Sequence, residues 1–324
     1  MPAKILISES IIGSPVDALA AEFRVVADPE LWKAPEKLRA QLAETEAWIV
    51  RNQTRVTAEM IAAAPGLRVI GRAGVGLDNV EVAAASAAGI VVAWTPDQNS
   101  ISVAELALGM MLALARKIPS ADRHVKETGW QRNRFFGVEL FGKTLGVIGM
   151  GRIGFLTAMR ARALGMNVLA FDKYVSPDSA QVTEARAQLV GLDELLARSD
   201  FVSCHAPLTK ETRHLFNYER FAMMKASAYF LNLARGEVVD EIGLARALSE
   251  GRIAGAALDV REQEPPGPSP LSAMENVILT PHIAAFTNEG QARVTAAICG
   301  DIAAVLRGGE ARNFVNFPRP RNRT

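Results

Sequence analysis

Three glycines stand at the spacing G-x-G-x-x-G in the stretch TLGVIGMGRIG: Gly149, Gly151 and Gly154. An apolar run precedes them and a helix-like run, RIGFLTAMRARALG, follows, so the motif joins a strand to a helix. In such a turn the first glycine permits the tight bend, the second lets the backbone approach a pyrophosphate, and the third lets the helix pack on the sheet. The phosphates then lie at a helix N-terminus, where free N–H groups and the helix dipole favour negative charge. The pattern therefore predicts a dinucleotide-binding site.

An acidic residue, Asp172, ends the next apolar run, NVLAFD. A carboxylate at this place accepts hydrogen bonds from the adenosine ribose and repels a 2′-phosphate, so NAD is favoured over NADP. Lys173 beside it leaves the use of NADP open. The alternative reading, that Asp172 only caps a turn, also stays open.

Three further stretches carry chemistry-bearing residues: NLARGEVVD (232–240), ALDVREQEP (257–265) and TPHIAAFT (280–287). Together with the glycine motif they closely resemble the D-2-hydroxyacid dehydrogenase family, and the resemblance covers essentially the whole chain. It implies an NAD-dependent oxidoreductase acting on CH–OH, with Arg235, Glu264 and His282 as the catalytic residues. Further cofactor contacts implied at matching positions are Arg152, Ile153, His205, Pro207, Ala234 and Asp259.

The chemistry explains why the three catalytic residue types are needed. Moving a hydride between a hydroxy acid and nicotinamide also moves a proton at the oxygen of the same carbon, so a group that titrates near neutrality, His282, is needed there. Glu264 would orient the ring and favour its protonated form. Arg235 can hold the substrate carboxylate and polarise the carbonyl. The alternatives are a structural histidine, a solvated loop carboxylate and a surface ion pair.

The substrate is indicated by a loop, GRAGVGLDNV (71–80), which resembles the family loop whose backbone N–H groups, here around Val75 and Gly76, hold the substrate carboxylate. This loop and the stretches at 49–57 and 129–146 look closest to 3-phosphoglycerate dehydrogenases. On that resemblance Arg51 and Arg72 face a doubly charged substrate, and Arg132 or Arg134 adds to them. We expect an anionic three-carbon acid, 3-phosphoglycerate first. The alternative is that these arginines are scattered over the surface.

Two features depart from the phosphoglycerate dehydrogenase pattern. Ile-Ala-Ala-Phe follows His282 where the family usually has small residues and Ser or Thr, so Phe286 is expected to reshape the pocket or the domain interface. The chain stops at residue 324, so a C-terminal regulatory domain with serine feedback is not expected.

Two other functions stay open. One is an enzyme of the same family that acts on glyoxylate, hydroxypyruvate or sulfolactate. The other is a dinucleotide-sensing binding protein, like the transcriptional co-repressors that resemble this family and retain the Arg, Glu and His set.

The elements that position these groups are visible as short apolar runs. Their apolarity is continuous rather than alternating, which is typical of parallel strands covered on both faces, and helix-like segments separate them. The fold class is therefore α/β, with two doubly wound parallel-sheet domains. The runs lie at 4–8, 23–28, 47–52, 67–74 and 89–94, and then at 144–151, 167–172, 200–205, 228–235, 255–260 and 276–283.

The resemblance also implies the domain order. A Rossmann NAD-binding domain (99–286) is inserted in a flavodoxin-like substrate-binding domain (1–98 and 287–324), and the active site is expected in the cleft between them. Residues 99–118 are predicted as one long helix, capped by Asn99 or Ser100 and closed by Pro119, which joins the domains and contributes to a homodimer. The final stretch, PRPRNRT, is predicted to be a disordered tail.

The composition limits the partners. The chain has 36 Lys and Arg against 35 Asp and Glu, a net charge of +1 that offers no electrostatic footprint for nucleic acid or an anionic membrane. Its 2 cysteines are too few for a disulfide framework, and no metal-ligand spacing occurs, so we predict no bound metal. The apolar stretch 101–118 contains Glu105 and Arg116, which favours a buried helix over a membrane span. We expect a cytoplasmic protein whose partner is a small 2-hydroxy or 2-keto acid.

Overall fold

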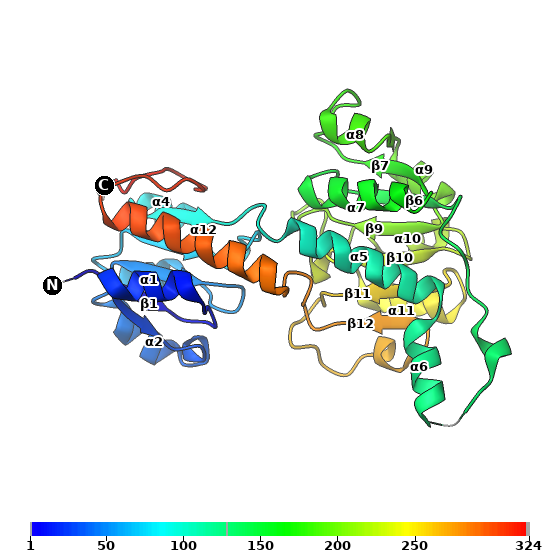
Figure 1. Cartoon of the computed structure of the whole chain (residues 1–324), viewed down its shortest axis with the longest axis horizontal. Helices are drawn as coiled ribbons and strands as arrows, with labels where there is room; N and C mark the ends of the chain where they lie inside the picture. Colours follow the sequence, from blue (N-terminus) through cyan, green and yellow to red (C-terminus); the bar gives the residue numbers. More distant parts are fainter. Residues whose placement is uncertain (1, 128, 322–324) are drawn as a thin grey trace. The chain divides into compact units, whose positions relative to one another are not determined.

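The computed structural model describes residues 2–127 and 129–321, and it divides into two compact units. The first unit comprises Met1–Asn99 and Thr287–Thr324, and the second comprises Ser100–Phe286. Each unit is built on its own parallel sheet, and the second unit is inserted into the chain of the first (Figure 1).

The sheet of the first unit has five strands in the order β2-β1-β3-β4-β5, which is the order of flavodoxin-like folds. Every residue of β1, β3 and β4 is buried. The strands are β1 (Lys4–Ile7), β2 (Arg24–Ala27), β3 (Ala47–Val50), β4 (Val69–Arg72) and β5 (Val91–Trp94). The helices are α1 (Ser14–Glu22), α2 (Pro35–Leu42), α3 (Ala58–Ala62), α4 (Val82–Ala87) and α12 (Asn288–Leu306), with a 3-10 turn, η1 (Leu31–Lys33).

Helices cover both faces of this sheet, and this explains the unbroken apolar runs. Successive residues of β1 enter opposite cores: Ile5 and Ile7 join the core that includes Ile298 of α12, and Leu6 joins the core that includes Leu42 of α2. Helices α1 and α12 come from the two ends of the sequence and pack side by side (Figure 1).

The C-terminal segment of the first unit is ordered along the edge of the sheet. Val315 N donates to Val92 O at 2.9 Å and Arg321 N donates to Gly89 O at 2.9 Å, so the segment follows β5 in the antiparallel direction. The predicted disordered tail is therefore wrong for residues 318–321, because these backbone bonds cover an otherwise open strand edge. Residues 322–324 lie outside the described residues.

The sheet of the second unit has seven strands in the order β12-β11-β10-β9-β6-β7-β8. Counted from β6, this is the doubly wound order of the Rossmann fold with one further strand, and the order reverses between β6 and β9. The strands are β6 (Thr144–Ile148), β7 (Asn167–Phe171), β8 (Gln188–Leu189), β9 (Phe201–Cys204), β10 (Tyr229–Asn232), β11 (Gly255–Leu258) and β12 (Val277–Leu279).

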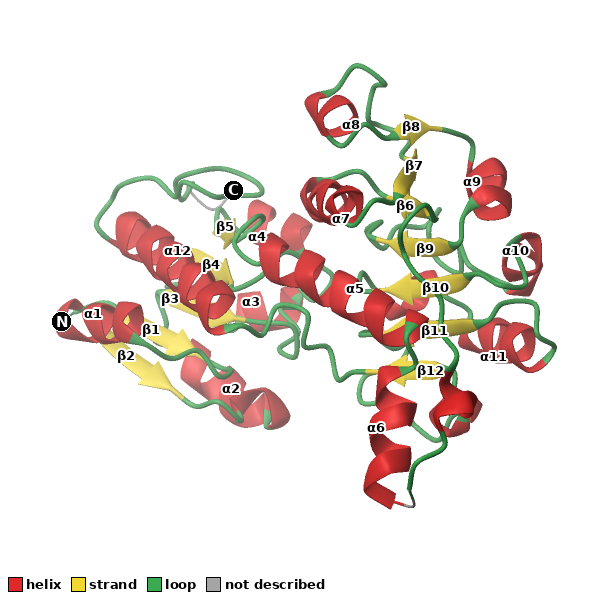
Figure 2. Cartoon of the chain, turned by 45° about the vertical axis from the view of Figure 1, so that its right-hand side comes forward, coloured by secondary structure: helices red, strands yellow, loops and turns green. Residues whose placement is uncertain are grey.

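Helices also cover both faces of the second sheet (Figure 2). Helices α5 and α7 pack together on one face, and α9, α10 and α11 lie on the other. The helices are α5 (Ser100–Ala115), α6 (Ile118–Glu127), α7 (Arg152–Ala163), α8 (Ala180–Glu184), α9 (Leu192–Arg198), α10 (Tyr218–Met223) and α11 (Glu241–Ser249). The 3-10 turns are η2 (Arg132–Phe135), η3 (Gly236–Val238) and η4 (Pro270–Ala273).

The predicted long helix at 99–118 is wrong at its end. Helix α5 stops at Ala115, Lys117 adopts a positive φ of 52°, and α6 then begins with Pro119 in its first turn. Proline is tolerated there because the first N–H groups of a helix have no intrahelical acceptor. A proline that was expected to close one helix therefore helps to start the next.

Candidate active site

Six predicted site residues lie at one edge of the second sheet, because each follows the carboxyl end of a parallel strand. Ligands of doubly wound sheets bind at this edge, at the point where the strand order reverses. Gly149 follows β6, Asp172 follows β7, His205 follows β9, Arg235 follows β10, Glu264 follows β11 and His282 follows β12.

Two glycines of the motif are required by the fold itself. Gly149 has φ +90°, and a Cβ on it would lie 2.9 Å from the backbone N of Ala206, in the turn after β9. A Cβ on Gly154 would lie 2.0 Å from the carbonyl oxygen of Gly149, so only glycine lets the first turn of α7 pack against the end of β6. These contacts set the turn at the point where the strand order reverses.

Gly151 differs from its two neighbours in the motif. It is the N-cap of α7, no side chain caps the helix there, and a Cβ on it would meet no atom within 4 Å among the described residues. The fold therefore does not require glycine at this position. A pyrophosphate bound against the turn would require it, because a side chain would occupy the same space. The N–H groups of Arg152 and Ile153 follow in the first helical turn, where they have no intrahelical acceptor.

Asp172 is held at the side of the glycine turn. Its Oδ2 accepts a hydrogen bond from Met150 N at 2.8 Å, and its Oδ1 accepts one from Tyr174 N at 2.8 Å. Each carboxylate oxygen keeps a second lone pair for a ribose hydroxyl. Asp172, Gly149 and Pro207 line one cavity of about 480 Å³, together with apolar residues that include Phe171 and Leu192.

Lys173 is paired with an acid at the same cavity. Its Nζ donates to Oε2 of Glu211 at 2.6 Å, and this hydrogen bond raises the pKa of Lys173. Asp193 and Glu194 line the cavity as well. The lysine charge is therefore compensated, and the lining carries more acidic than basic charge around Asp172.

His205 is placed beside this cavity as a neutral ring. Its Nε2 lies 2.9 Å from Ser203 Oγ, and burial lowers the pKa of His205 to about 4. The imidazole is thus uncharged at neutral pH. His205 therefore offers an uncharged ring and one hydrogen bond at the point where the strand order reverses.

His282 and Glu264 form a hydrogen-bonded pair. His282 Nδ1 lies 2.8 Å from Glu264 Oε2, and the other carboxylate oxygen, Oε1, accepts a hydrogen bond from Arg261 N at 3.1 Å. With Nδ1 directed at the carboxylate, Nε2 is the ring atom left to exchange a proton with another molecule. His282 also has a positive φ of 55°, which is uncommon for a residue with a side chain.

Asp259 holds the backbone of the His282 loop. Its carboxylate is 1% exposed and accepts hydrogen bonds from Thr280 Oγ1 at 2.5 Å, Ile283 N at 2.9 Å and Ala284 N at 2.9 Å. In addition, His282 N donates to Asp259 O at 2.8 Å. The structure thus gives Asp259, which we predicted as a cofactor contact, a place under the loop that carries His282.

Arg235 approaches the pair through a close backbone contact. A Cβ on Gly236 would lie 1.9 Å from the carbonyl carbon of Arg261, so glycine lets the turn after β10 lie directly on the turn after β11. Arg235 Nη1 donates to Ala234 O at 2.7 Å, and Asn232 fixes the turn by donating from Nδ2 to Arg235 O at 2.8 Å.

The Glu264 carboxylate is stabilised in its charged form. Burial alone raises the pKa of Glu264, but the hydrogen bond and charge of His282, the N–H of Arg261 and the charge of Arg235 outweigh burial and hold the pKa below its usual value. The structure therefore brings Arg235, Glu264 and His282 together electrostatically.

The predicted substrate residues lie in the first unit, after β3 and β4. Arg72 ends β4 and is 6% exposed; its guanidinium lies beneath Gly74 and donates from Nη1 to Ala73 O at 3.3 Å. Above it, the N–H groups of Val75 and Gly76 donate no hydrogen bond to residues 2–127 or 129–321. The loop therefore presents backbone donors over a buried cation.

Arg51 is fixed by a buried acid that we did not predict. Glu9 is 5% exposed, and its carboxylate accepts hydrogen bonds from Arg51 N at 2.7 Å and Thr54 N at 2.9 Å. Arg51 Nη1 donates to Ser10 O at 3.2 Å. Burial lowers the pKa of Arg51, and the charge of Glu9 opposes this shift.

Arg134 is placed away from the catalytic edge. Its Nη2 contacts both oxygens of Glu275, at 2.8 and 2.9 Å. Glu275 precedes β12, whereas His282 follows it, so Arg134 lies at the opposite edge of the same sheet. The position of Arg134 in the second unit therefore does not support the prediction that it joins the substrate arginines.

The motifs did not identify the residues that support the predicted site residues: Glu9, Asn232, Gly236, Glu241 and Arg261. Glu9 and Glu241 lie outside the quoted stretches and act over 42 and 20 positions, whereas Asn232, Gly236 and Arg261 lie within those stretches but carried no predicted role. The GE dipeptide after Arg235 was the one available signal, since a glycine there suggests close approach of another backbone.

Within residues 2–127 and 129–321, His, Cys, Asp and Glu side chains nowhere gather in threes as a metal ion would require. No helix in those ranges combines the length and the apolar character needed to cross a bilayer.

Comparison with known proteins agrees with this geometry. Residues 108–284 match the family model described as D-isomer specific 2-hydroxyacid dehydrogenase, NAD binding domain, which is more than half of the chain. D-3-phosphoglycerate dehydrogenase of Archaeoglobus fulgidus is 47% identical over 316 residues, covering 97% of this chain. The chain spans 59% of the length of that relative.

Solved structures share the whole fold. A Thermus thermophilus protein is 35% identical with a TM-score of 0.91, covering 96% of this chain and 99% of its own. D-lactate dehydrogenase from Aquifex aeolicus, complexed with NAD and lactic acid, is 31% identical with a TM-score of 0.87, covering 97% of this chain and 99% of its own. The chain, with its glycine turn and its Arg235, Glu264 and His282 set, belongs to the D-isomer-specific 2-hydroxyacid dehydrogenase family.

Proposed function

We propose that the chain catalyses reversible, NAD-dependent hydride transfer at C2 of an anionic 2-hydroxy acid. The observation that carries the proposal is the His282–Glu264 hydrogen bond of 2.8 Å, at the same sheet edge as the open glycine turn. A proton-transfer group and a dinucleotide turn on neighbouring strand ends are what this reaction requires.

The residues of the second unit fit NAD. Gly151 leaves room where a pyrophosphate would bind, the first N–H groups of α7 would hold it, and the second lone pairs of the Asp172 carboxylate would accept from the ribose. The acidic lining around Asp172 and the pairing of Lys173 with Glu211 disfavour a 2′-phosphate, so we propose NAD rather than NADP. When bound, NAD supplies or accepts the hydride.

His282 transfers the proton. In oxidation of the hydroxy acid its Nε2 takes the hydroxyl proton, and in reduction of the keto acid it returns a proton to the carbonyl oxygen. Glu264 holds the ring through Nδ1 and stabilises the charge that the ring gains. Arg235 binds the substrate carboxylate and polarises the carbonyl, because guanidinium stays charged and donates through a planar fork.

We propose 3-phosphoglycerate as the first substrate candidate. Arg51, Arg72 and the N–H groups of Val75 and Gly76 offer cationic and backbone donors in the first unit, which suits the phosphate and carboxylate of this acid. The 47% identity to a D-3-phosphoglycerate dehydrogenase supports the same choice. Glyoxylate, hydroxypyruvate and sulfolactate are the other candidates.

A substrate panel tests the proposal. NADH oxidation is followed with 3-phosphohydroxypyruvate, hydroxypyruvate, glyoxylate and 3-sulfopyruvate, and kcat/KM is compared. We expect the phosphorylated acid to rank first. If it ranks last, the substrate proposal is wrong; if no 2-keto acid oxidises NADH, the enzymatic proposal is wrong and a dinucleotide-sensing protein is favoured.

We further propose that the chain forms a homodimer through residues 118–141 rather than mainly through α5. Large apolar side chains are exposed there: Trp130 is 79% exposed, Phe136 78% and Phe141 77%. Large exposed apolar side chains within one segment favour a protein interface there. Sedimentation of the wild type and of a Trp130→Ser/Phe136→Ser variant tests this proposal; a wild-type monomer contradicts it.

A cytoplasmic location is proposed from the cysteines. Cys204 and Cys299 are both buried and unbridged, so the described fold uses no disulfide. The proposed partners are a small 2-hydroxy or 2-keto acid and NAD, without nucleic acid or membrane.

A further inference from the structure

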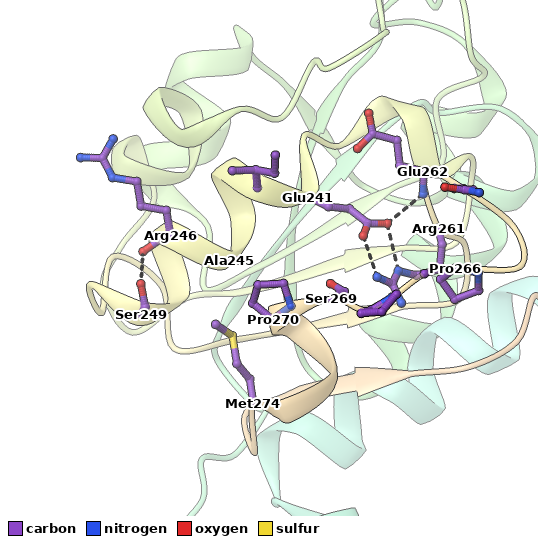
Figure 3. A pocket seen from close by; sticks show the side chains of 14 residues that line it. Glu241, Ala245, Arg246, Ser249, Arg261, Glu262, Pro266, Ser269, Pro270 and Met274 are labelled. Carbon is purple, nitrogen blue, oxygen red and sulfur yellow. Dashed lines mark hydrogen bonds and ion pairs between the residues drawn. The ribbon is translucent and has the colours of Figure 1, made fainter.

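An ion pair outside the catalytic set holds the segment that carries Glu264. Arg261 Nε donates to Glu241 Oε1 at 2.9 Å and Arg261 Nη2 donates to Glu241 Oε2 at 2.6 Å, which is a bidentate pair. The side chains are only 8% and 16% exposed. Figure 3 shows Glu241 between the guanidinium of Arg261 and the backbone at Glu262.

Glu241 binds this segment at two residues, Arg261 and Glu262. Besides the two side-chain bonds, its Oε1 accepts a hydrogen bond from Glu262 N at 2.8 Å. Glu241 itself is fixed, because it opens α11 directly after Asp240, whose side chain accepts from Ile242 N and Gly243 N. The start of a capped helix therefore sets the position of the backbone at residues 261 and 262.

The backbone at residues 261 and 262 contacts the proposed catalytic residues. Arg261 N donates to Glu264 Oε1 at 3.1 Å, and Glu264 Oε2 holds His282. Gly236, which follows Arg235, packs directly against the carbonyl of Arg261. A shift of this one peptide would change the direction of the Glu264 carboxylate and the approach of Arg235 together.

We propose that Glu241 and Arg261 are positioning residues that hold Glu264 and Arg235 in register with His282. This inference concerns the reaction given above as the proposed function and rests on it. Catalytic geometry is sensitive to such shifts, since a misplacement of about 1 Å costs up to about 10²-fold in rate.

The test compares Glu241→Gln and Arg261→Met with the conservative Arg261→Lys. Removing one partner leaves a buried charge unpaired, so the double variant Glu241→Gln/Arg261→Met is included as the form without a lone charge. The control is Arg246→Met, which breaks an exposed pair with Glu250 on the same helix. Melting temperature confirms folding of each variant.

Two readouts decide the role. We expect kcat to fall about 10- to 100-fold in the single and double variants, while KM and the NADH Kd stay within about threefold, with partial recovery in Arg261→Lys. We also expect the ring nitrogen chemical shifts of His282, measured by NMR at one pH in protein without cofactor, to move toward those of Glu264→Gln, because the Nδ1 hydrogen bond to Glu264 is weakened. The control should match the wild type in both.

The outcomes separate the inference from the function. A folded double variant with wild-type kcat and unchanged ring nitrogen chemical shifts of His282 overturns the positioning role. A wild type without turnover on any 2-keto acid overturns the proposed function, and the His282 chemical shifts in the same variants then still decide whether the pair positions Glu264.

Discussion

The two sets of functional groups are held in different ways. In the second unit two of the proposed catalytic side chains, His282 and Glu264, are joined directly by a hydrogen bond of 2.8 Å. In the first unit Arg51 and Arg72 are fixed by Glu9 and backbone carbonyls, and the N–H groups of Val75 and Gly76 donate no hydrogen bond to described residues. In the proposed function, the set in the second unit supplies the groups for the chemistry, while the set in the first unit supplies donors for an anion.

This difference predicts how kinetic effects divide. Changes at the second set should lower kcat, because they alter groups that act in the transition state. Changes at the first set should raise KM, because they remove binding that is shared by ground state and transition state.

The largest effect is expected at His282. His282→Ala removes the proposed proton-transfer group, so kcat should fall about 10²- to 10⁴-fold while NADH binding stays near wild type. Steady-state kinetics with 3-phosphohydroxypyruvate and NADH fluorescence measure the two quantities. An unchanged kcat removes His282 from the chemistry.

A smaller effect, on KM, is expected at Arg51. Arg51→Met removes the proposed charge-assisted hydrogen bond to the substrate anion, so KM for 3-phosphohydroxypyruvate should rise about 10- to 100-fold with little change in kcat. Glyoxylate, which has no phosphate, should be affected less. Arg55→Met is the matched control, since Arg55 is an exposed cation on the same loop. Equal effects of the two substitutions would reduce the role of Arg51 to general charge.

The glycine motif allows cofactor binding to be separated from folding. Gly151→Ala adds a Cβ where the described fold has space, so NADH Kd should rise about tenfold with little change in melting temperature. Gly154→Ala places a Cβ 2.0 Å from Gly149 O, so it should destabilise the fold by about 1–3 kcal/mol. Chemical denaturation and NADH titration of both variants check this. A reversed pattern would mean that the turn is not built for a ligand.

Much of this arrangement could be predicted from the sequence. Eleven of the strands in the structure lie within the apolar runs, because buried parallel strands need apolar residues on both faces. Strand β8 was missed because it has only 2 residues and neither is buried. The glycine motif and the apolar run after it indicated Gly149 and Asp172 directly, whereas the family resemblance of three separate stretches indicated Arg235, Glu264 and His282.

The supports of the site could not be predicted in the same way. Glu241 and Arg261 are 20 residues apart in the chain, and Glu9 meets Arg51 across 42 positions, so no period or spacing links them. The helix break at Lys117 could not be predicted, because the proline that follows, Pro119, suits either the end of one helix or the start of the next. The ordered C-terminal segment depended on an open edge of β5, which is a property of the sheet.

The smallest effect concerns the cysteines, one in each unit. Burial raises the pKa of Cys204 to about 12 and that of Cys299 to about 11, so almost no thiolate exists at pH 8. A thiol reagent should leave the folded protein unmodified and label both cysteines in denaturant, with no loss of activity before unfolding. Rapid labelling at pH 8 with retained fold would contradict the burial of these side chains.

The central claim is hydride transfer at C2 of a 2-keto acid, and isotope transfer tests it most directly. The protein is incubated with 3-phosphohydroxypyruvate and NADH deuterated on both C4 positions, and the product is examined by mass spectrometry and chiral analysis. We expect one deuterium at C2 and the D isomer. A product without deuterium, or with the L configuration, would contradict the proposed reaction.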